Sequence, residues 1–333
     1  MRIDRGRKMG DITAFGVTAG GTSVRKITLR AGDLTASILT WGAVLQSVRL
    51  AGVAHDLTLG SDHLADYEGD MRHHGALIAP VVNRLSGAQA SIAGQDHRFE
   101  ANQDNTHCLH SGAAGTHLKV WDMQSASDTE AVLTLDLPAG EGGFPGNRRI
   151  TVRFAVLPPA SLRMDVTATT DAPTIFNAAN HSYWNLDGSA RWDGHSLRID
   201  ADSFLPTTDA FTPTGEIASV AGGSHDFRVS RAISVGHPAL DNCFCLGLAR
   251  GPLRDVLQLT GQSGLAMTVA TTETGVQLYD GRQAVRPGHS AYEGLAIEAQ
   301  GWPDAPNHQG FPSIDLMPDQ PVCQVTEWRF AQA

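Results

Sequence analysis

Cysteine is scarce in this sequence, and its four cysteines have no spacing that predicts a disulfide framework or a metal site. Cys108, Cys243, Cys245 and Cys323 are spread over 333 residues. Cys243 and Cys245 form a C-x-C pair, whereas zinc knuckles and redox motifs use C-x-x-C. Disulfide scaffolds are usually short chains with many more cysteines for their length. These observations favour a reduced, cytoplasmic protein.

Long apolar runs and clusters of positive charge are also missing. No apolar stretch approaches the length of a transmembrane helix, and the charged N-terminus lacks the apolar segment of a secretory signal. The chain has 25 basic and 35 acidic residues, a formal net charge of −10. Its only dense group of Lys and Arg lies within residues 1–8, so little is available to neutralise phosphates. We therefore expect neither a membrane nor a nucleic acid as a partner.

Helical periodicity is missing as well, since no segment longer than a turn or two shows it. Short stretches of alternating apolar and polar residues are present instead, separated by Gly, Pro, Asn and Asp. The expected strands cover residues 24–29, 34–39, 45–50, 131–137, 150–156, 162–169, 266–270 and 276–279. This pattern, with 35 glycines and 16 prolines, is typical of an antiparallel sandwich or barrel. We predict an all-β fold with one domain over residues 13–333, preceded by a flexible tail over residues 1–12.

The segment 177–186, Asn-Ala-Ala-Asn-His-Ser-Tyr-Trp-Asn-Leu, is unusually rich in polar and aromatic side chains. It follows the expected strand 162–169, so we expect His181 at or just past a strand that can aim its side chain. Imidazole has the unperturbed pKa nearest neutrality, which makes His181 a candidate proton donor or acceptor. Tyr183 and Trp184 offer flat apolar faces on which a sugar ring can pack. The alternative is a structural histidine held in the core.

Two carboxylates lie among apolar neighbours. Glu298 stands between Ile297 and Ala299, and Asp241 follows Leu240. A buried carboxylate is costly unless it has a partner or a task. Glu298 is therefore a candidate general base, and Asp241 is a candidate partner for sugar hydroxyls or a catalytic histidine. The alternatives are a paired structural carboxylate at position 298 and an Asx-turn at position 241.

Arg84 and His110 are candidate binding residues. Arg84 follows Asn83 and the apolar run 76–82, and its guanidinium can direct two donors onto vicinal hydroxyls or a carboxylate. The alternative is an arginine at the surface that caps a strand end. His110 lies next to Ser111-Gly112, where the glycine allows the backbone to bend the histidine into a cleft.

Two further groups of residues resemble parts of known functional sites, one a metal site and the other a phosphate loop. The histidines 73, 74, 107, 110 and 117 suggest a metal site, but the sequence has no His-Glu-x-x-His and no neighbouring carboxylate pair, so we expect no metal. Residues 142–147, Gly-Gly-Phe-Pro-Gly-Asn, have turn chemistry but lack the lysine of a phosphate loop. We interpret them as structural.

In their order along the chain, these motifs resemble the aldose 1-epimerase (galactose mutarotase) family from about residue 34 to residue 330. The matching segments are Asn83-Arg84, Leu109-His110, residues 143–147, 180–186, 213–215, 226–228, 240–244 and 298–308. The resemblance implies a single large antiparallel β-supersandwich that interconverts the α and β anomers of a free aldose such as galactose or glucose, without a cofactor. It also implies a monomer or a homodimer.

The same resemblance assigns roles to particular residues. It implies that the acid and the base are His181 and Glu298. The implied sugar-binding positions are Arg84, His110 and Asp241, with Asn83, Tyr183 and Gln277 near the ring.

Three positions depart from the pattern of the family. Ser111 stands where glycine is usual, which predicts a less bent loop beside His110. Val82 replaces a common alanine, and Cys323 replaces a common tyrosine. These departures bear on the preferred sugar more than on the reaction.

Three other functions use parts of the same set of residues. An epimerase for a phosphorylated hexose needs a basic cluster around the pocket, and the sequence has Arg84 but no run of Lys or Arg near the other motifs. A non-catalytic sugar-binding protein has no need for both His181 and Glu298. A retaining glycosidase needs two close carboxylates, for which Asp241 and Glu298 are the candidates, but this leaves His181 unexplained.

Overall fold

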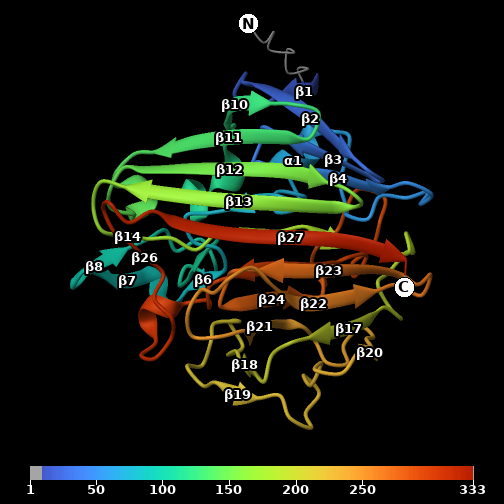
Figure 1. Ribbon diagram of the computed structural model, residues 1–333. Coiled ribbons are helices and arrows are strands. Elements are labelled where there is room, and N and C mark those ends of the chain that lie inside the picture. Colours follow the sequence, from blue (N-terminus) through green and yellow to red (C-terminus); the bar gives the residue numbers. More distant parts are fainter. Residues whose placement is uncertain (1–9, 333) are drawn as a thin grey trace, which may run out of the picture.

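The computed structural model describes residues 10–332, which fold almost entirely into antiparallel strands (Figure 1). The longest helix in this range is α1 (Leu64–Glu68), and the other helical pieces are short 3-10 turns. Each stretch that the sequence predicted as a strand lies in one, so the all-β prediction is confirmed. Strand β1 begins at Asp11, inside the segment expected as a tail, and residues 1–9 of that segment lie outside the described residues.

A nine-stranded sheet crosses the middle of the molecule (Figure 1). In β13, Leu162, Met164, Val166 and Ala168 are buried, while the residues between them are half-buried. This is the alternation expected of a sheet with one face against the core. The strand order is β10 (Asp122–Ala126), β11 (Glu130–Leu137), β12 (Arg148–Leu157), β13 (Ser161–Thr170), β27 (Val322–Gln332), β23 (Leu265–Thr271), β22 (Arg254–Thr260), β17 (Ser196–Ile199) and β20 (Arg231–Ala232).

A six-stranded sheet packs against the same core. Its order is β16 (Tyr183–Trp184), β25 (Leu295–Gln300), β24 (Gly275–Tyr279), β21 (Asp241–Cys245), β18 (Ser203–Leu205) and β19 (Ala218–Ser219). All residues of β25 are buried, so this strand is covered on both faces. A polar side chain on β25 therefore lies inside the molecule and needs either a partner or a function.

A four-stranded sheet and several short pairs complete the fold. The four-stranded sheet consists of β1 (Asp11–Val17), β2 (Ser23–Ala31), β3 (Leu34–Leu39) and β4 (Leu45–Leu50). The short pairs are β5 (Leu77–Ile78) with β15 (Ala179–Asn180), β6 (Arg84–Leu85) with β9 (Cys108–Leu109), β7 (Gln89–Ile92) with β8 (Gln95–Arg98), and β14 (Thr174–Ile175) with β26 (Asp315–Leu316).

The three large sheets share one hydrophobic core. Ile38 of the four-stranded sheet, Phe154 of the nine-stranded sheet and Ile297 of the six-stranded sheet belong to the same buried cluster. Trp184 and Trp328 join the two larger sheets, with ring centroids 5.9 Å apart. Because the sheets bury their apolar faces against one another, they hold the edges and loops between them in fixed positions.

The turn predicted at residues 142–147 is present. Gly142, Gly143 and Gly146 all have positive φ, and Phe144 between them is fully buried. A Cβ on Gly143 would lie 2.0 Å from the carbonyl oxygen of Arg98, so only glycine fits there. The turn thus fixes the approach of the chain to β12.

All four cysteines lie within the described range, and each is free. Cys108, Cys243 and Cys245 are buried, and Cys323 is exposed. Across residues 10–332, no helix has both the length and the apolar character needed to cross a membrane.

Candidate active site

The register of three neighbouring strands places Glu298, Gln277 and Asp241 on one face of the six-stranded sheet. Gln277 of β24 pairs with Glu298 of β25 on one side and with Cys243 of β21 on the other. Asp241 lies two residues before Cys243 and therefore points to the same face. Gln277 Nε2 donates a hydrogen bond of 2.7 Å to Asp241 Oδ1.

His181 reaches the same face from the turn between β15 and β16. The sequence predicted a strand just before it, and that strand is the short β15, because the longer 162–169 stretch belongs to β13 of the other sheet. The backbone of His181 is fixed on both sides: its N–H donates to Ala76 O (2.9 Å), and its carbonyl accepts from Gly75 N (3.0 Å). Its Nε2 lies 3.7 Å from Glu298 Oε1.

The two remaining atoms of this pair have no partner. His181 Nδ1 and Glu298 Oε2 are buried and form no hydrogen bond with any other residue of the described range. Buried polar atoms are nearly always satisfied in folded proteins, so exceptions call for an explanation. A catalytic pair that must bond to a substrate in the course of a reaction is one such explanation.

Asn83 and His110 come from two loops that are joined by hydrogen bonds. Both residues have left-handed backbone, with φ of 64° and 52°. The His110 N–H donates to Asn83 O (2.9 Å), and the Asn83 N–H donates to His110 Nδ1 (3.1 Å). Because Nδ1 accepts, the neutral ring carries its proton on Nε2, which is then a donor.

The prediction that Ser111 makes this loop less bent is wrong. Ser111 has φ 65° and ψ 14°, so it takes up the left-handed conformation that glycine usually provides. Its hydroxyl accepts from Val81 N (2.9 Å) and donates to Val81 O (3.0 Å), which compensates for the strain of a side chain in this region. Val82 is buried, and Cys323 is exposed on β27 outside the cavity lining.

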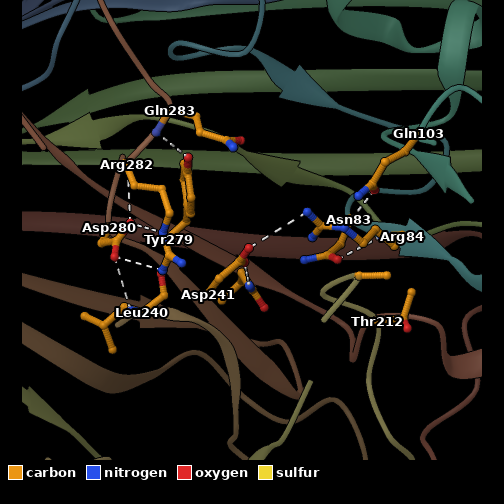
Figure 2. Close-up of polar contacts among 12 residues, drawn as sticks. Asn83, Arg84, Gln103, Thr212, Leu240, Asp241, Tyr279, Asp280, Arg282 and Gln283 are labelled. Atoms are coloured by element: carbon orange, nitrogen blue, oxygen red, sulfur yellow. Dashed lines mark hydrogen bonds and ion pairs between the residues drawn. The ribbon is translucent and has the colours of Figure 1, made fainter. Parts of the chain in front are cut away.

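Arg84 and Asp241 face each other across the site (Figure 2). The closest atoms, Nη2 and Oδ2, are 3.8 Å apart, and both side chains are largely buried. Arg84 Nε donates to Gln103 Oε1 (2.9 Å), and its guanidinium lies 5.3 Å from the centre of the Phe211 ring. With one edge of the guanidinium held, the remaining donors are directed toward Asp241 and the space between them.

These side chains surround one cavity of about 500 Å³. Of the residues predicted for the site, Asn83, Arg84, His110, His181, Tyr183, Asp241 and Glu298 line it. Gln277 does not line it; it is buried beside Asp241 and holds that carboxylate in place. The structure thus brings together almost all of a set that spans over two hundred positions in the sequence.

Several lining residues were not predicted as part of the site. They include Arg72, His73, Phe211, Tyr279 and Arg282. From the sequence, His73 and His74 suggest only a metal site. Within residues 10–332, however, no group of three or more His, Cys, Asp or Glu side chains is arranged to hold a metal ion. No local pattern marks Phe211, which comes from a loop in the second half of the chain, as a cavity residue.

Burial sets the protonation of the central pair. Burial, aided by the charge of Asp241, raises the pKa of Glu298 to about 8, and Arg84 opposes this shift. Burial lowers the pKa of His181 to about 4. Between these values the pair holds one proton, and the low polarity of the site favours the form in which both groups are neutral.

The other ionisable groups in the wall are affected in the same way. Burial raises the pKa of the Asp241 carboxyl, although Arg84 lowers it. Burial and the neighbouring histidines place the pKa of His110 well below its usual value. His110 is therefore a neutral hydrogen-bonding group near neutral pH and not a second cation.

A sequence profile described as aldose 1-epimerase matches residues 25–327. The chain belongs to the aldose 1-epimerase family. The galactose mutarotase of Mus musculus is 30% identical to this chain in sequence, and the alignment covers 96% of this chain and 98% of the relative. The aldose 1-epimerase of Escherichia coli (strain K12) is also 30% identical, with 93% and 96% covered.

Solved structures agree with this assignment to the aldose 1-epimerase family. A GalM/aldose epimerase homologue from C. elegans superposes with a TM-score of 0.85 at 27% identity, covering 92% of this chain and 99% of that chain. The galactose 1-epimerase from Lactobacillus acidophilus gives a TM-score of 0.84 at 25% identity, covering 98% and 100%. The galactose mutarotase-like fold inferred from the motifs is thereby confirmed.

Proposed function

We propose that this protein interconverts the α and β anomers of a free aldose by acid–base catalysis at His181 and Glu298. The observation that carries the proposal is the position of this pair, 3.7 Å apart on the wall of the cavity. Arg84, His110 and Asp241 line the same cavity and offer donors and acceptors for sugar hydroxyls. The family to which the chain belongs supports this reaction.

Ring opening needs two proton transfers that this pair can perform together. Glu298 takes the proton from the C1 hydroxyl, and His181 gives a proton to the ring oxygen. The C1–ring oxygen bond breaks with its electron pair going to the oxygen, and a carbonyl forms at C1. Rotation about the C1–C2 bond exposes the other face of the carbonyl. Closure reverses both transfers and returns each proton to its starting group.

The number of protons on the pair fits this cycle. Burial favours a neutral Glu298 and a neutral His181, with pKa values of about 8 and about 4. Moving the one proton from Glu298 to His181 produces the reactive carboxylate and imidazolium without changing the net charge of the site. Hydrogen bonds from the sugar hydroxyls replace solvent around the pair and stabilise this charged form.

The proposed substrate is an uncharged aldose of the galactose or glucose type. Asp241 and Arg84 face each other, so part of each charge is already balanced by the other. Named relatives at about 30% identity are galactose mutarotases and aldose 1-epimerases, which supports this class of sugar. Galactose is the first sugar to test.

A phosphorylated aldose is the second candidate, and one observation favours it. The sequence has no run of Lys or Arg near the motifs other than Arg84, but in the structure Arg72 and Arg282 line the cavity together with Arg84. Arg282 is bound to both oxygens of Asp280 (each 2.9 Å), whereas the side chain of Arg72 donates only to the carbonyl of Gly69 within the described range. Arg72 is exposed and lines the cavity, so it is available for an anionic group of the substrate.

The test is the optical rotation of freshly dissolved α-D-galactose with wild type, His181→Ala and Glu298→Gln. We expect wild type to accelerate mutarotation and each substitution to lower kcat on the order of 10²–10⁴-fold, while calorimetry shows that galactose still binds. Glu216→Gln, at an exposed loop position, is the matched control and should retain full activity. Undiminished kcat in Glu298→Gln contradicts the assignment. Acceleration only with hexose 6-phosphates would establish the second candidate.

We also propose that the protein is cytoplasmic and either monomeric or homodimeric. The four free cysteines support a reducing compartment. Size-exclusion chromatography with light scattering tests the assembly.

A further inference from the structure

His73 is a cavity residue that the proposed reaction has not yet used. It lies in the turn after α1, where its carbonyl accepts from Ala76 N (3.2 Å). It is half-buried and lines the cavity together with His181 and Glu298. A residue in this position is close enough to act on the substrate or on the catalytic pair.

The ring of His73 is packed among three other imidazoles. It stacks on His181, with centroids 5.7 Å apart and an angle of 27° between the planes. Its centroid is 4.8 Å from that of His110 and 5.1 Å from that of His117. His73 therefore bridges the catalytic histidine and a sugar-binding histidine.

The orientation of His181 depends on such packing. A catalytic imidazole is usually oriented by a hydrogen bond from its second nitrogen to a carboxylate or carbonyl. Here Nδ1 of His181 has no hydrogen-bond partner among residues 10–332. Ring contacts remain: the stacked His73, His110 edge-on at 5.4 Å and Tyr183 at 5.0 Å.

The ring nitrogens of His73 can also bind a polar group of the substrate. Unlike the fully enclosed nitrogens of His74, its ring nitrogens are not sealed off by the protein, and they form no hydrogen bond within the described range. Burial is the main cause that lowers the pKa of His73 well below its usual value, and the neighbouring Arg72 and histidines, which would repel a second positive charge, add to it. A neutral imidazole has one donor and one acceptor, which suits a sugar hydroxyl.

We propose that His73 positions His181 by stacking on its ring and binds a hydroxyl group of the aldose through a ring nitrogen. The proposal rests on the proposed function. The two parts of the role are separable, because the stack needs a flat ring and the hydroxyl needs a polar atom.

Two substitutions separate the stacking role of His73 from its contact with the sugar hydroxyl. His73→Phe keeps a flat ring and removes the nitrogens, so we expect KM for α-D-galactose to rise roughly 2- to 12-fold, the cost of one hydrogen bond, with kcat close to wild type. His73→Gln keeps polar atoms and removes the ring, so we expect kcat to fall by up to about 100-fold with little change in KM.

The pH profile provides a readout that a purely structural role would not change. Removing the ring in His73→Gln admits water beside His181, which lessens its desolvation and raises its pKa. The acid limb of kcat/KM should then move to higher pH in His73→Gln and stay in place in His73→Phe. The acid limb reports the pKa of His181. The other ionisable groups that face His73 are Arg72, His74, His110 and His117.

The controls separate failure of this proposal from failure of the proposed function. His63→Ala, exposed at the start of α1, should behave as wild type, and the thermal unfolding midpoint of each variant verifies its fold. Wild-type KM in His73→Phe overturns the hydroxyl contact, and wild-type kcat and acid limb in His73→Gln overturn the positioning role. If wild type itself does not accelerate mutarotation, the proposed function fails instead.

Discussion

At the scale of single residues, the central feature is one proton shared by two buried groups. Glu298 and His181 have pKa values displaced in opposite directions, to about 8 and about 4, and burial is the main cause of both shifts. Groups whose pKa values are pushed apart in this way are typical of acid–base sites. Each group alone would be a costly buried ion, but together they carry no net charge as long as they hold one proton.

The pH dependence of kcat/KM follows from this count. Below about pH 4 the pair takes a second proton on His181 and cannot accept one from the sugar, and above about pH 8 it has no proton to give to the ring oxygen. We therefore predict a bell-shaped profile with limbs near these values, measured by polarimetry with the uncatalysed rate subtracted at each pH. An acid limb near 6.5, the ordinary value for histidine, contradicts it.

The sequence was informative about residues whose chemistry conflicts with their neighbours. Glu298 in an apolar strand and Asp241 beside an apolar residue stood out because burying a carboxylate is expensive. His73 did not stand out, since its role depends on rings contributed by distant loops. Gln277 was predicted near the sugar, and in the structure it is buried and donates a hydrogen bond to Asp241. The local sequence shows that a charged group would be costly to bury, but it does not show which neighbour offsets that cost.

At the scale of elements, alternation predicted strands such as β12 and β13 because it directly records which side chains face the core. It did not predict the pairing of strands. β13 pairs with β12, the preceding strand, on one side and with β27, from the end of the chain, on the other. Such long-range pairing is decided by which apolar faces fit together in the folded molecule, and a local pattern does not contain that information.

The turn before β12 gives a prediction at this scale. Gly143→Ala places a Cβ 2.0 Å from Arg98 O at φ 88°, whereas Gly140→Ala has φ 83° and open space around it. Gly140→Ala should cost about 1–2 kcal/mol of unfolding free energy from backbone strain alone, and Gly143→Ala should cost about 1–3 kcal/mol more from steric overlap. Urea unfolding of the two variants measures the difference. Equal costs would show that the chain near Arg98 moves aside freely.

At the scale of the whole molecule, the three large sheets form one contiguous core. Side chains from all three belong to a single buried cluster, and the rings of Trp184 and Trp328 pack at an angle of 39° across two of the sheets. Elements that bury their apolar faces only against each other lose that burial together.

We therefore predict one cooperative unfolding transition, as expected from a single domain over residues 13–333. Differential scanning calorimetry should show one peak. On heating, tryptophan fluorescence should change at the same temperature as the far-UV circular dichroism. The fluorescence reports the contact between sheets, and the dichroism reports the strands themselves. Two separated transitions would mean that the sheets unfold as independent units.

Several kinds of contact join two loops of the site: the loop that carries Asn83 and Arg84, and the loop that carries His110. Their backbones pair as β6 and β9, Asn83 and His110 exchange hydrogen bonds, and Ser111 is bonded in both directions to Val81. For protein engineering, the two loops are a single exchangeable part. Transplanting one loop from a relative with another sugar preference would bring in half of a matched set. New specificity is better sought by moving both loops together, with the serine and its backbone partner included.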